Sequence, residues 1–507
     1  MDNFYIAILS FAFIFLLHHL LGRKPNKAPL PSPPAIPFAG HIHLVKKPFH
    51  AVLSRLAERH GPLFSLRLGT FNAVVVSSPA LAKECFTEMD VTFANRPRLP
   101  SWKFLSEDYS MIATSSYNPH WRNLRRVAAV QLLSTHRVSC MSGVISGEVH
   151  AMVRRLNRSA TESPRIRLKQ RLFELSLSVL METIANTKAT RSEATAADTD
   201  MSVEAQEFRT VMDNINPLVG LANLWELLPI VRWFDVSGIK NKLLASVTRR
   251  DAFLQRLIDA ERRKVEDGGS EDGKKSMISV MFGLQKKEPN VYTDKMIRGL
   301  ITSLFSAGTD TILATTEWAM SLLLNHPTAL KKAHAQIDQV VGTSRLVSSE
   351  DLSRLTYLQC IISETLRLYP AAPLLLPRQT YVDCKIGGHT IPSGTMLICN
   401  AYAIHRDPNV WEDPLEFKPD RFEDGKAEGL FMIPFGMGRR KCPGEAMALR
   451  TMGLVLGALI QCFEWDRVDD AKVDMKEYGE EFVVFRAIPF EALCKPRASM
   501  YDVLERL

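Results

Sequence analysis

The segment Phe435 to Gly444 constrains this 507-residue chain most, because it sets one cysteine among three glycines directly before an apolar helical run. The segment reads Phe-Gly-Met-Gly-Arg-Arg-Lys-Cys-Pro-Gly, and the apolar run extends from Glu445 to Phe463. Proline suits the first turn of a helix, so Pro443 predicts that a helix begins there. Cys442 is then expected just before a helix N-terminus, where the dipole and the free N–H groups stabilise a thiolate.

The glycines and the arginine of this segment indicate what the thiolate binds. Gly436, Gly438 and Gly444 carry no side chain, so the backbone can approach something flat and bulky. Arg440 supplies a fixed cation for a carboxylate near the thiolate. A haem that is held by a cysteine thiolate, with arginine on its propionates, needs all these features. A buried structural thiol is the usual role of a lone cysteine, but it does not explain these neighbours.

A second unusual segment interrupts a long apolar stretch. Met296 to Leu324 is apolar at helical spacing, but Ala307-Gly308-Thr309-Asp310-Thr311 stands at its centre. Polar groups in a buried helix raise the free energy of the fold unless they are satisfied or useful. The alternative to a functional role is a helix kink in which the threonines bond back to the preceding turn.

Two pairs at helical spacing carry weaker signals. Glu364 and Arg367 lie three apart in a helical stretch expected from about Glu350 to Tyr369, so they share a face and can pair. Trp121 and Arg125 lie four apart and point to one side of a helix. Each pair alone is also typical of ordinary surface packing.

Taken together, these segments resemble the cytochrome P-450 superfamily, whose haem-binding signature is FxxGxRxCxG. Every specified position is matched here, by Phe435, Gly438, Arg440, Cys442 and Gly444. The resemblance implies the cytochrome P-450 fold, which is mainly α with a minor β portion. It also implies a haem b (iron protoporphyrin IX) whose iron takes Cys442 as its axial ligand.

The resemblance assigns roles to the weaker segments as well. Phe417 to Phe422, which reads FKPDRF, is similar to the family's PERF segment with Asp in place of Glu. By resemblance, Glu364, Arg367 and Arg421 form a buried structural triad. Trp121 and Arg125 match the family's WxxxR segment, and they are expected on a haem propionate together with Arg378.

The central Ala307 to Thr311 segment is similar to the family's AGxDT segment. The resemblance implies that Thr311 supports the bound dioxygen and that Asp310 helps to deliver protons. Position 312 is Ile, where many relatives carry Ser or Thr, so a second relay hydroxyl is in doubt. Thr302, Ser303 and Ser306, one or two turns earlier, could hydrogen-bond the hydroxyls of a substrate.

The N-terminus predicts a membrane anchor. The stretch from Phe4 to Leu21 is just long enough to cross a bilayer as a helix. Only Asp2 precedes it as a charged side chain, whereas Arg23, Lys24 and Lys27 follow it, so the body is expected on the cytosolic side. A cleaved signal peptide would need a basic start and a small-residue cleavage site, and a buried core helix is the other alternative. We therefore expect a transmembrane helix at 1–22, a basic and Pro-rich hinge at 23–40, and a haem-thiolate monooxygenase domain at 41–507.

Composition and the remaining patterns exclude several classes of protein. The formal charge is +8 and the basic residues are scattered, without a basic stripe or reader motif, so a nucleic-acid-binding role is not expected. Eight cysteines without a CxxC pair argue against a zinc site or a disulfide framework. Strand-like runs are few: a hairpin is expected over Leu63 to Ser77, and short strands over Cys384 to Ile391 and Gly394 to Ile398.

No GxGxxG fingerprint for a flavin or nicotinamide lies between a strand and a helix, so the electrons are expected from outside the chain. The resemblance implies NADPH as their source and a separate NADPH–cytochrome P-450 reductase as the partner. That partner would dock near the cysteine, where Arg122, Arg126, Arg439 and Lys441 could meet an acidic surface.

The combination of anchor, hinge and motifs is similar to plant microsomal members, in particular to the family of isoflavone hydroxylases, methylenedioxy-bridge synthases and xanthone synthases. It implies an enzyme of the endoplasmic reticulum membrane that oxidises a mid-sized, fairly apolar phenolic by ring hydroxylation or oxidative ring closure. The alternatives are a haem-thiolate isomerase or dehydratase, a monooxygenase acting on a terpenoid or fatty acid, and a membrane-tethered haem- or ligand-binding protein. Candidate substrate-lining segments are Leu99 to Phe104, Phe208 to Asn216, Ile301 to Thr309, Ala371 to Leu376 and Glu481 to Val484.

Overall fold

A computed structural model describes most of the chain. It covers residues 30–190, 201–220, 224–228, 238–267, 275–427, 429–480 and 482–507, together with positions 6, 9, 10, 12 and 13. The expected anchor at 1–22 otherwise lies outside the described residues, as does the first part of the hinge.

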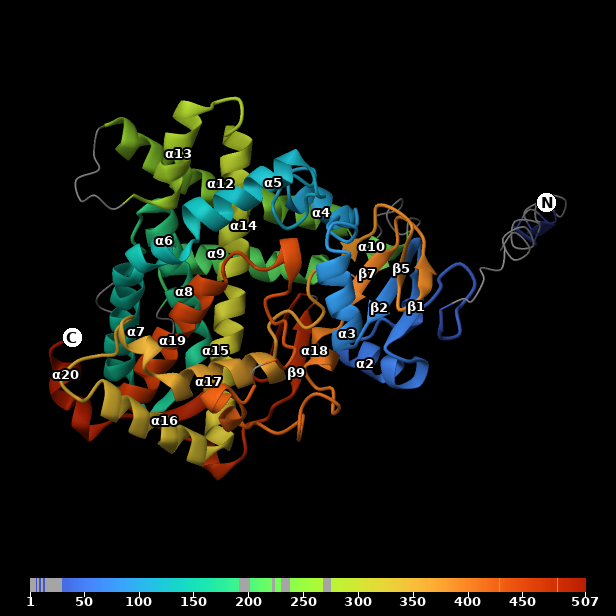
Figure 1. Ribbon diagram of the computed structural model, residues 1–507. Helices are drawn as coiled ribbons and strands as arrows, with labels where there is room; N and C mark the ends of the chain where they lie inside the picture. The colour runs from blue at the N-terminus through green and yellow to red at the C-terminus, as the bar shows by residue number, and fades with distance from the viewer. Residues whose placement is uncertain are drawn as a thin grey trace.

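Helices form the larger part of the molecule and fill one side of the view in Figure 1, while a smaller β-rich part lies beside them. The largest apolar core lies among the helices. The α-helices are α2 (Phe49–His60), α3 (Pro79–Lys83), α4 (Pro100–Leu105), α5 (Pro119–Arg126), α6 (Thr135–Cys140), α7 (Ser142–Glu162), α8 (Leu168–Ala185), α9 (Val203–Ile215), α10 (Leu224–Leu227), α12 (Ile239–Glu266), α13 (Met277–Lys287), α14 (Asp294–Gly308), α15 (Asp310–Asn325), α16 (Pro327–Val340), α17 (Thr356–Leu368), α18 (Ala401–Ile404), α19 (Glu445–Cys462) and α20 (Tyr501–Glu505).

Short strands and single turns complete the fold. The strands are β1 (Leu63–Leu68), β2 (Phe71–Val76), β3 (Arg165–Arg167), β4 (Arg378–Gln379), β5 (Cys384–Ile386), β6 (His389–Ile391), β7 (Met396–Cys399), β8 (Phe463–Asp466), β9 (Glu477–Glu480), β10 (Val483–Arg486) and β11 (Glu491–Pro496). Short 3-10 and π segments are η1 (Ile42–Leu44), η2 (Glu84–Glu88), η3 (Val127–Leu132), η4 (Asn216–Leu218), η5 (Asp351–Ser353), η6 (Pro419–Gly425), η7 (Gly438–Arg440), η8 (Val468–Asp470) and η9 (Ala498–Met500).

The largest sheet has the strand order β1-β2-β7-β4 and joins distant parts of the chain. β1 and β2 form the expected hairpin, with Leu68 opposite Phe71 at its turn. β2 then pairs in parallel with β7, and Val74 lies opposite Leu397. β7 and the last four residues of β2 are buried and apolar, which is typical of strands covered on both faces. Two smaller cores cover this sheet.

The long apolar stretch forms two helices in line, α14 and α15, and the break lies within the predicted polar segment. α14 ends at Gly308, and Thr309 (φ −85°, ψ −69°) separates it from α15. The Thr311 hydroxyl donates to the Ala307 carbonyl at 2.8 Å, and the Thr309 hydroxyl contacts the Phe305 carbonyl at 3.4 Å. Both the interruption and the threonine back-bonding that the sequence suggested are therefore present.

Three boundaries differ from the sequence expectations. The Glu364 helix begins at Thr356 and not at about Glu350, because η5 and a turn precede it. The run from Cys384 to Ile391 is a hairpin of β5 and β6, since Gly387 and Gly388 have positive φ angles of 53° and 83°. Pro443 lies before the first turn of α19, because Gly444 is the residue that caps that helix.

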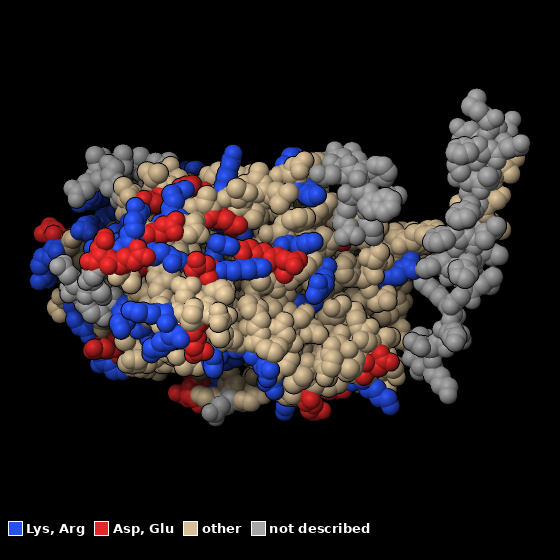
Figure 2. All heavy atoms as spheres, turned by 90° about the horizontal axis from the view of Figure 1, so that it is seen from above, with Lys and Arg blue, Asp and Glu red and all other residues tan. Residues whose placement is uncertain are grey.

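Surface charge is mixed on the face seen from above. Figure 2 shows Lys and Arg side chains interspersed with Asp and Glu side chains on this face, and the charges are densest over the helical part. Such mixing leaves no large field of one sign on this face. Within the described part of the chain, α19 is the one helix long and apolar enough to cross a membrane, but 72% of it is buried inside the protein, as in a core helix.

Candidate active site

The loop that carries Cys442 is closed by its own backbone. The Cys442 N–H donates to the Phe435 carbonyl at 2.8 Å, so residues 435–442 form a closed loop. Gly436 and Gly438 adopt φ angles of 69° and 70°, in the left-handed region that favours glycine. A Cβ at Gly438 would also collide with the Asp90 carboxylate. The turn thus requires two of the three glycines for backbone reasons.

Cys442 lies immediately before the helix that the sequence predicted. Gly444 is the N-cap of α19, and a Cβ there would lie 3.8 Å from the Cys442 Sγ. Burial raises the pKa of the Cys442 thiol, whereas the Gly444 N–H and the Arg125 guanidinium lower it. The residue nevertheless remains accessible to solvent. A metal ion with a free coordination position would complete the deprotonation of such a thiol.

Buried arginines cluster on the same side of the fold. Burial lowers the pKa of Arg440 to about 9, and the positive charges of Arg378 and Arg125 lower it further. The pKa of Arg378 falls to about 10, again mainly by burial. Arg96, which the sequence analysis did not single out, has its pKa lowered by burial and by Arg440 and Arg378. Four cations therefore lie close together in a poorly solvated region.

Asp90 is the acidic side chain that the structure places against this cluster. Its carboxylate lies 3.6 Å from the Arg378 Nη1 and 3.4 Å from the Arg439 Nε. The Arg378 Nη1 is buried and has no hydrogen-bond partner among the described residues. One carboxylate does not balance these charges, so the cluster suits a further ligand with two carboxylates. The two propionates of a haem have this charge, and the residues present fit that group.

Backbone carbonyl groups hold the other predicted propionate contacts. The Arg440 guanidinium donates to the carbonyl groups of Ala94, Ile112 and Ser115 at 2.6–3.2 Å. It also lies 4.1 Å from the ring centre of Trp121. The Trp121 indole N–H donates to the Ile112 carbonyl at 3.0 Å. Arg440 and Trp121 therefore fix the chain between residues 94 and 115 against the Cys442 loop.

Arg125 and Arg378, the remaining predicted propionate contacts, hydrogen-bond to the loop that carries Cys442. The Arg125 Nη1 donates to the Lys441 carbonyl at 2.5 Å, next to Cys442. The Arg378 Nη2 donates to the Met437 carbonyl at 2.6 Å.

The structure thus brings the predicted cofactor-binding residues around one loop. They are Trp121, Arg125, Arg378, Phe435, Gly438, Arg440 and Gly444.

Asp310 is buried, whereas Ala307, on the other side of the break, is exposed. Asp310 is 9% exposed, and burial raises the pKa of its carboxyl group. The Asn216 amide donates to the Asp310 Oδ2 at 3.3 Å. Ala307, one turn earlier, is exposed although Thr309 and the residues after Ile312 are buried. The helix is therefore less covered at Ala307 and Thr311 than at the residues around them.

The hydroxyls predicted to face a substrate differ in their availability. The Thr302 hydroxyl donates to the Arg298 carbonyl and the Ser303 hydroxyl donates to the Gly299 carbonyl, each at 2.7 Å. Both hydroxyls therefore donate to carbonyl groups of their own helix. The Ser306 Oγ is buried and has no hydrogen-bond partner among the described residues. Thr302 and Ser303 therefore use their protons on helix carbonyl groups and keep only lone pairs for a substrate, whereas Ser306 keeps both its proton and its lone pairs.

Glu364, Arg367 and Arg421 meet in one buried network. The Arg367 Nε and Nη2 donate to the two Glu364 oxygens at 2.7 and 2.9 Å, and the Arg421 Nε donates to Glu364 Oε1 at 3.0 Å. Glu364 and Arg367 are fully buried and Arg421 is nearly so. Arg367 also donates to the carbonyl groups of His405, Pro414 and Glu416. The network joins α17 to η6 and to the chain before it.

Arg96 and Asp90 escaped the sequence analysis, and Asn216 was included only as the end of a candidate substrate-lining segment, without its pairing to Asp310. Arg96 lies two positions after the buried pair Phe93 and Ala94. A charged residue so close to an apolar pair was the sequence signal that could have indicated a buried arginine. Asn216 had no signal beyond its place at the end of α9, since its partner Asp310 lies 94 positions away.

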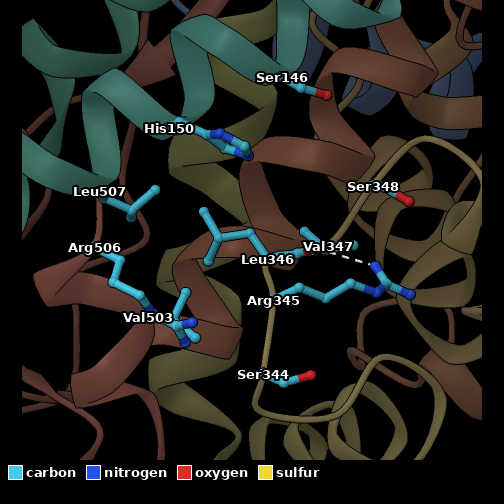
Figure 3. A pocket seen from close by; sticks show the side chains of 10 residues that line it. All are labelled: Ser146, His150, Ser344, Arg345, Leu346, Val347, Ser348, Val503, Arg506 and Leu507. Carbon is cyan, nitrogen blue, oxygen red and sulfur yellow. Dashed lines mark hydrogen bonds between the residues drawn. The ribbon is translucent and has the colours of Figure 1, made fainter.

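A separate hollow of about 340 Å³ lies elsewhere on the molecule. Figure 3 shows it between α7, the loop after α16 and the C-terminus, with His150, Arg345 and Arg506 among its lining residues. Arg345 is already paired with the buried Asp351 at 2.6 Å. None of the predicted site residues lines this hollow.

The family model of cytochrome P450 matches residues 30–492. The chain belongs to the cytochrome P450 family. Two solved structures of a zebrafish cytochrome P450, with abiraterone and with progesterone, superpose with a TM-score of 0.71 each. They are 23% and 24% identical to this chain and cover 88% and 89% of it, and 99% and 100% of their own chains. They show that the fold is the cytochrome P450 fold.

Known plant proteins are similar to this cytochrome P450 over nearly its whole length. Cytochrome P450 81Q32 of Catharanthus roseus is 42% identical and covers 99% of this chain and 97% of its own. A (+)-piperitol/(+)-sesamin synthase of Sesamum radiatum is 41% identical, over 98% of this chain and 97% of its own. An isoflavone 3'-hydroxylase of Medicago truncatula is 40% identical, over 99% of both chains. The protein is therefore a cytochrome P450 monooxygenase related to enzymes of plant specialised metabolism, and its family implies a haem with cysteine thiolate ligation.

Proposed function

We propose that this cytochrome P450 oxidises a mid-sized plant phenolic at a haem b whose iron takes Cys442 as its axial ligand. One observation carries the ligand assignment: Cys442 stands at the N-terminus of α19, in a glycine-dependent turn, beside a cluster of arginines that lacks a balancing charge. The haem, when bound, supplies the iron at which dioxygen is reduced and the substrate oxidised. Arg125, Arg378 and Arg440 would hold its propionates in this proposal, and Trp121, whose N–H donates to Ile112, would lie beside them.

Asp310 holds the proton that the reaction consumes. Because burial raises the pKa of this carboxyl group, it keeps its proton at a higher pH than an exposed aspartate does. The Asn216 amide occupies Oδ2, so Oδ1 is left to carry the proton. The Thr311 hydroxyl gives its hydrogen to Ala307 and keeps its lone pairs for accepting a hydrogen bond. This acid and alcohol favour a monooxygenase over the isomerase or dehydratase alternative.

The substrate class rests on the relatives and on one side chain. The plant relatives are named as isoflavone hydroxylases and as a piperitol/sesamin synthase, and all of these names denote phenolic or aryl ether chemistry. Ser306, whose buried hydroxyl has no partner in the part of the chain that the structure describes, is the residue best suited to bind a phenolic hydroxyl. Ring hydroxylation stands slightly ahead of oxidative ring closure in this proposal.

Electrons come from NADPH through a separate NADPH–cytochrome P-450 reductase. Two of the four basic residues expected at its docking surface already have acidic partners, because Lys441 pairs with Glu445 at 2.6 Å and Arg439 contacts Asp90. Arg122 and Arg126 remain at the surface of α5 for an acidic partner. We further propose a transmembrane helix at 1–22 in the endoplasmic reticulum membrane, a hinge at 23–40 and a cytosolic catalytic domain at 41–507.

Two measurements test the proposal. Substrate-binding difference spectra across phenolic, terpenoid and fatty-acid panels should show the strongest response with phenolics. Turnover under labelled dioxygen then distinguishes the two outcomes, since hydroxylation retains a labelled oxygen atom and ring closure does not. Efficient turnover of a terpenoid or fatty acid without binding of any phenolic would contradict the substrate class.

A further inference from the structure

His405 is a buried histidine between two parts of the site. It follows α18 directly, is fully buried, and its carbonyl group accepts a hydrogen bond from the Arg367 Nη1 at 2.8 Å. The residue therefore touches the Glu364–Arg367–Arg421 network through its backbone.

The His405 ring makes a second contact, to the chain that leads into the Cys442 loop. Its Nε2 accepts a hydrogen bond from the Ile433 N–H at 2.9 Å. Because a backbone N–H can only donate, this nitrogen carries no proton. The Ile433 carbonyl in turn accepts from the Gly436 N–H at 2.9 Å. One continuous series of contacts thus runs from Arg367 through His405 to the turn that holds Cys442.

The surroundings keep the ring neutral. Burial lowers the pKa of His405 to about 3, and the positive charges of Arg406 and Arg367 act in the same direction. Nδ1 is therefore the protonated nitrogen. It is buried next to the carbonyl groups of Leu366 and Arg367, although neither closes a hydrogen bond of good geometry with it.

We propose that His405 is a positioning residue that couples the Glu364–Arg367–Arg421 network to the loop that carries Cys442. The proposal rests on Cys442 being the haem ligand. Without an acceptor at residue 405, the Ile433 N–H is buried without a hydrogen bond. The chain that leads into the Cys442 loop then loses the contact that fixes its position. The thiolate then converts more readily to a weakly bound thiol, with loss of the thiolate-type spectrum.

Three substitutions in the full-length holoenzyme test this coupling. His405→Leu fills the space without an acceptor, whereas His405→Gln places an amide oxygen that can accept from Ile433. His41→Leu is a matched control, because His41 is equally buried and its Nδ1 accepts the Arg67 N–H at 2.8 Å, far from the Cys442 loop in the sequence. The measurements are the ferrous carbon monoxide spectrum, its rate of conversion from the thiolate to the thiol type, and deuterium exchange in residues 431–436.

His405→Leu should raise the conversion rate about tenfold, which is the effect of one lost buried hydrogen bond, and it should raise exchange in 431–436. His405→Gln and His41→Leu should convert within about twofold of the unmodified enzyme. Equal rates in His405→Leu and the unmodified enzyme, or fast conversion in His41→Leu, would overturn the coupling. If His405→Leu does not accumulate, a stable His405→Gln holoenzyme supports the proposal and an equally unstable one contradicts it. An unmodified enzyme without the thiolate-type spectrum would instead refute the Cys442 assignment.

Discussion

At the scale of single residues, Arg378 shows how this site differs from an ordinary protein interior. Its guanidinium is 4% exposed, packs 3.9 Å from the ring centre of Phe86, and donates one hydrogen bond to Met437. Buried cations are normally paired, but the Asp90 carboxylate is at 3.6 Å, beyond hydrogen-bond range. A residue in this position is poorly satisfied by the protein alone, which is typical of a cofactor contact.

Cys442→Ala should abolish the thiolate-type ferrous carbon monoxide spectrum. No other cysteine lies between Phe435 and Gly444, so the loop offers no second thiol to replace it. Spectra of the purified variant, with Cys140→Ala as an exposed-thiol control, check this outcome. A thiolate-type spectrum in Cys442→Ala would mean that another residue binds the iron.

Thr311→Ala should bind haem and substrate normally but form less product per NADPH consumed. We expect a reduction of about tenfold, less than the hundredfold typical of a lost general acid, because water can partly replace a hydroxyl. Thr311→Ser is the matched control, since it keeps the hydroxyl that donates to Ala307. Hydrogen peroxide and product are measured against NADPH, and unchanged coupling in Thr311→Ala would remove this residue from the mechanism.

At the scale of elements, the Glu364–Arg367–Arg421 network joins α17 to η6 through charge. Arg367 fills the junction with five hydrogen bonds to Glu364 and to three carbonyl groups. Its guanidinium also lies 5.1 Å from the ring centre of the buried Trp411. Glu364 and Arg367 are fully desolvated, so the geometry of the junction depends on each of these partners.

Arg367→Leu should destabilise the protein more than Arg421→Leu. Removing Arg367 leaves the Glu364 carboxylate buried with one partner fewer and costs about 3–5 kcal/mol. Arg421 is 12% exposed and gives Glu364 a single hydrogen bond, so its loss costs about 1–3 kcal/mol. Unfolding in urea and the yield of holoenzyme measure the difference. An Arg421→Leu variant as unstable as Arg367→Leu would show that exposure does not govern this network.

Elements with their own sequence periodicity could be predicted from the sequence, whereas those built on distant pairing could not. α19 has the bounds of the predicted apolar run to within one residue, and the β1–β2 hairpin lies within the predicted range Leu63 to Ser77. The sheet β3-β11-β8 was missed, because Arg165–Arg167 is short and its partner lies over 320 positions later. Arg96 was missed for the same reason, since its acceptors Leu376 and Pro377 are distant.

At the scale of the whole molecule, the buried His405 makes the free energy of unfolding decrease as the pH falls. Its folded pKa of about 3 lies below the ordinary value of 6.5, so the unfolded chain binds a proton first as the pH falls. Stability should therefore decrease between pH 6.5 and 3, by up to about 1.4 kcal/mol per pH unit from this residue. His405→Gln should reduce that slope in urea unfolding. An unchanged slope would assign the acid sensitivity to other groups.

Deletion of residues 1–27 should release much of the protein from membranes and leave haem binding intact. Every residue proposed to bind haem follows position 120, and the described fold begins at residue 30. Fractionation of membranes, together with the carbon monoxide spectrum of each fraction, checks the result. Loss of the spectrum on deletion would show that the N-terminal segment takes part in folding.

In the proposed haem site, the arginine cluster around Cys442 would also make the abundance of this enzyme depend on the supply of haem. Arg96, Arg378 and Arg440 repel one another, so a bound dianion would add directly to the stability of the fold. A newly synthesised chain that meets no haem stays in its less stable form, where the proteases of the cell remove it. In a tissue with limited porphyrin synthesis, the level of messenger RNA for this protein will therefore overstate its catalytic capacity.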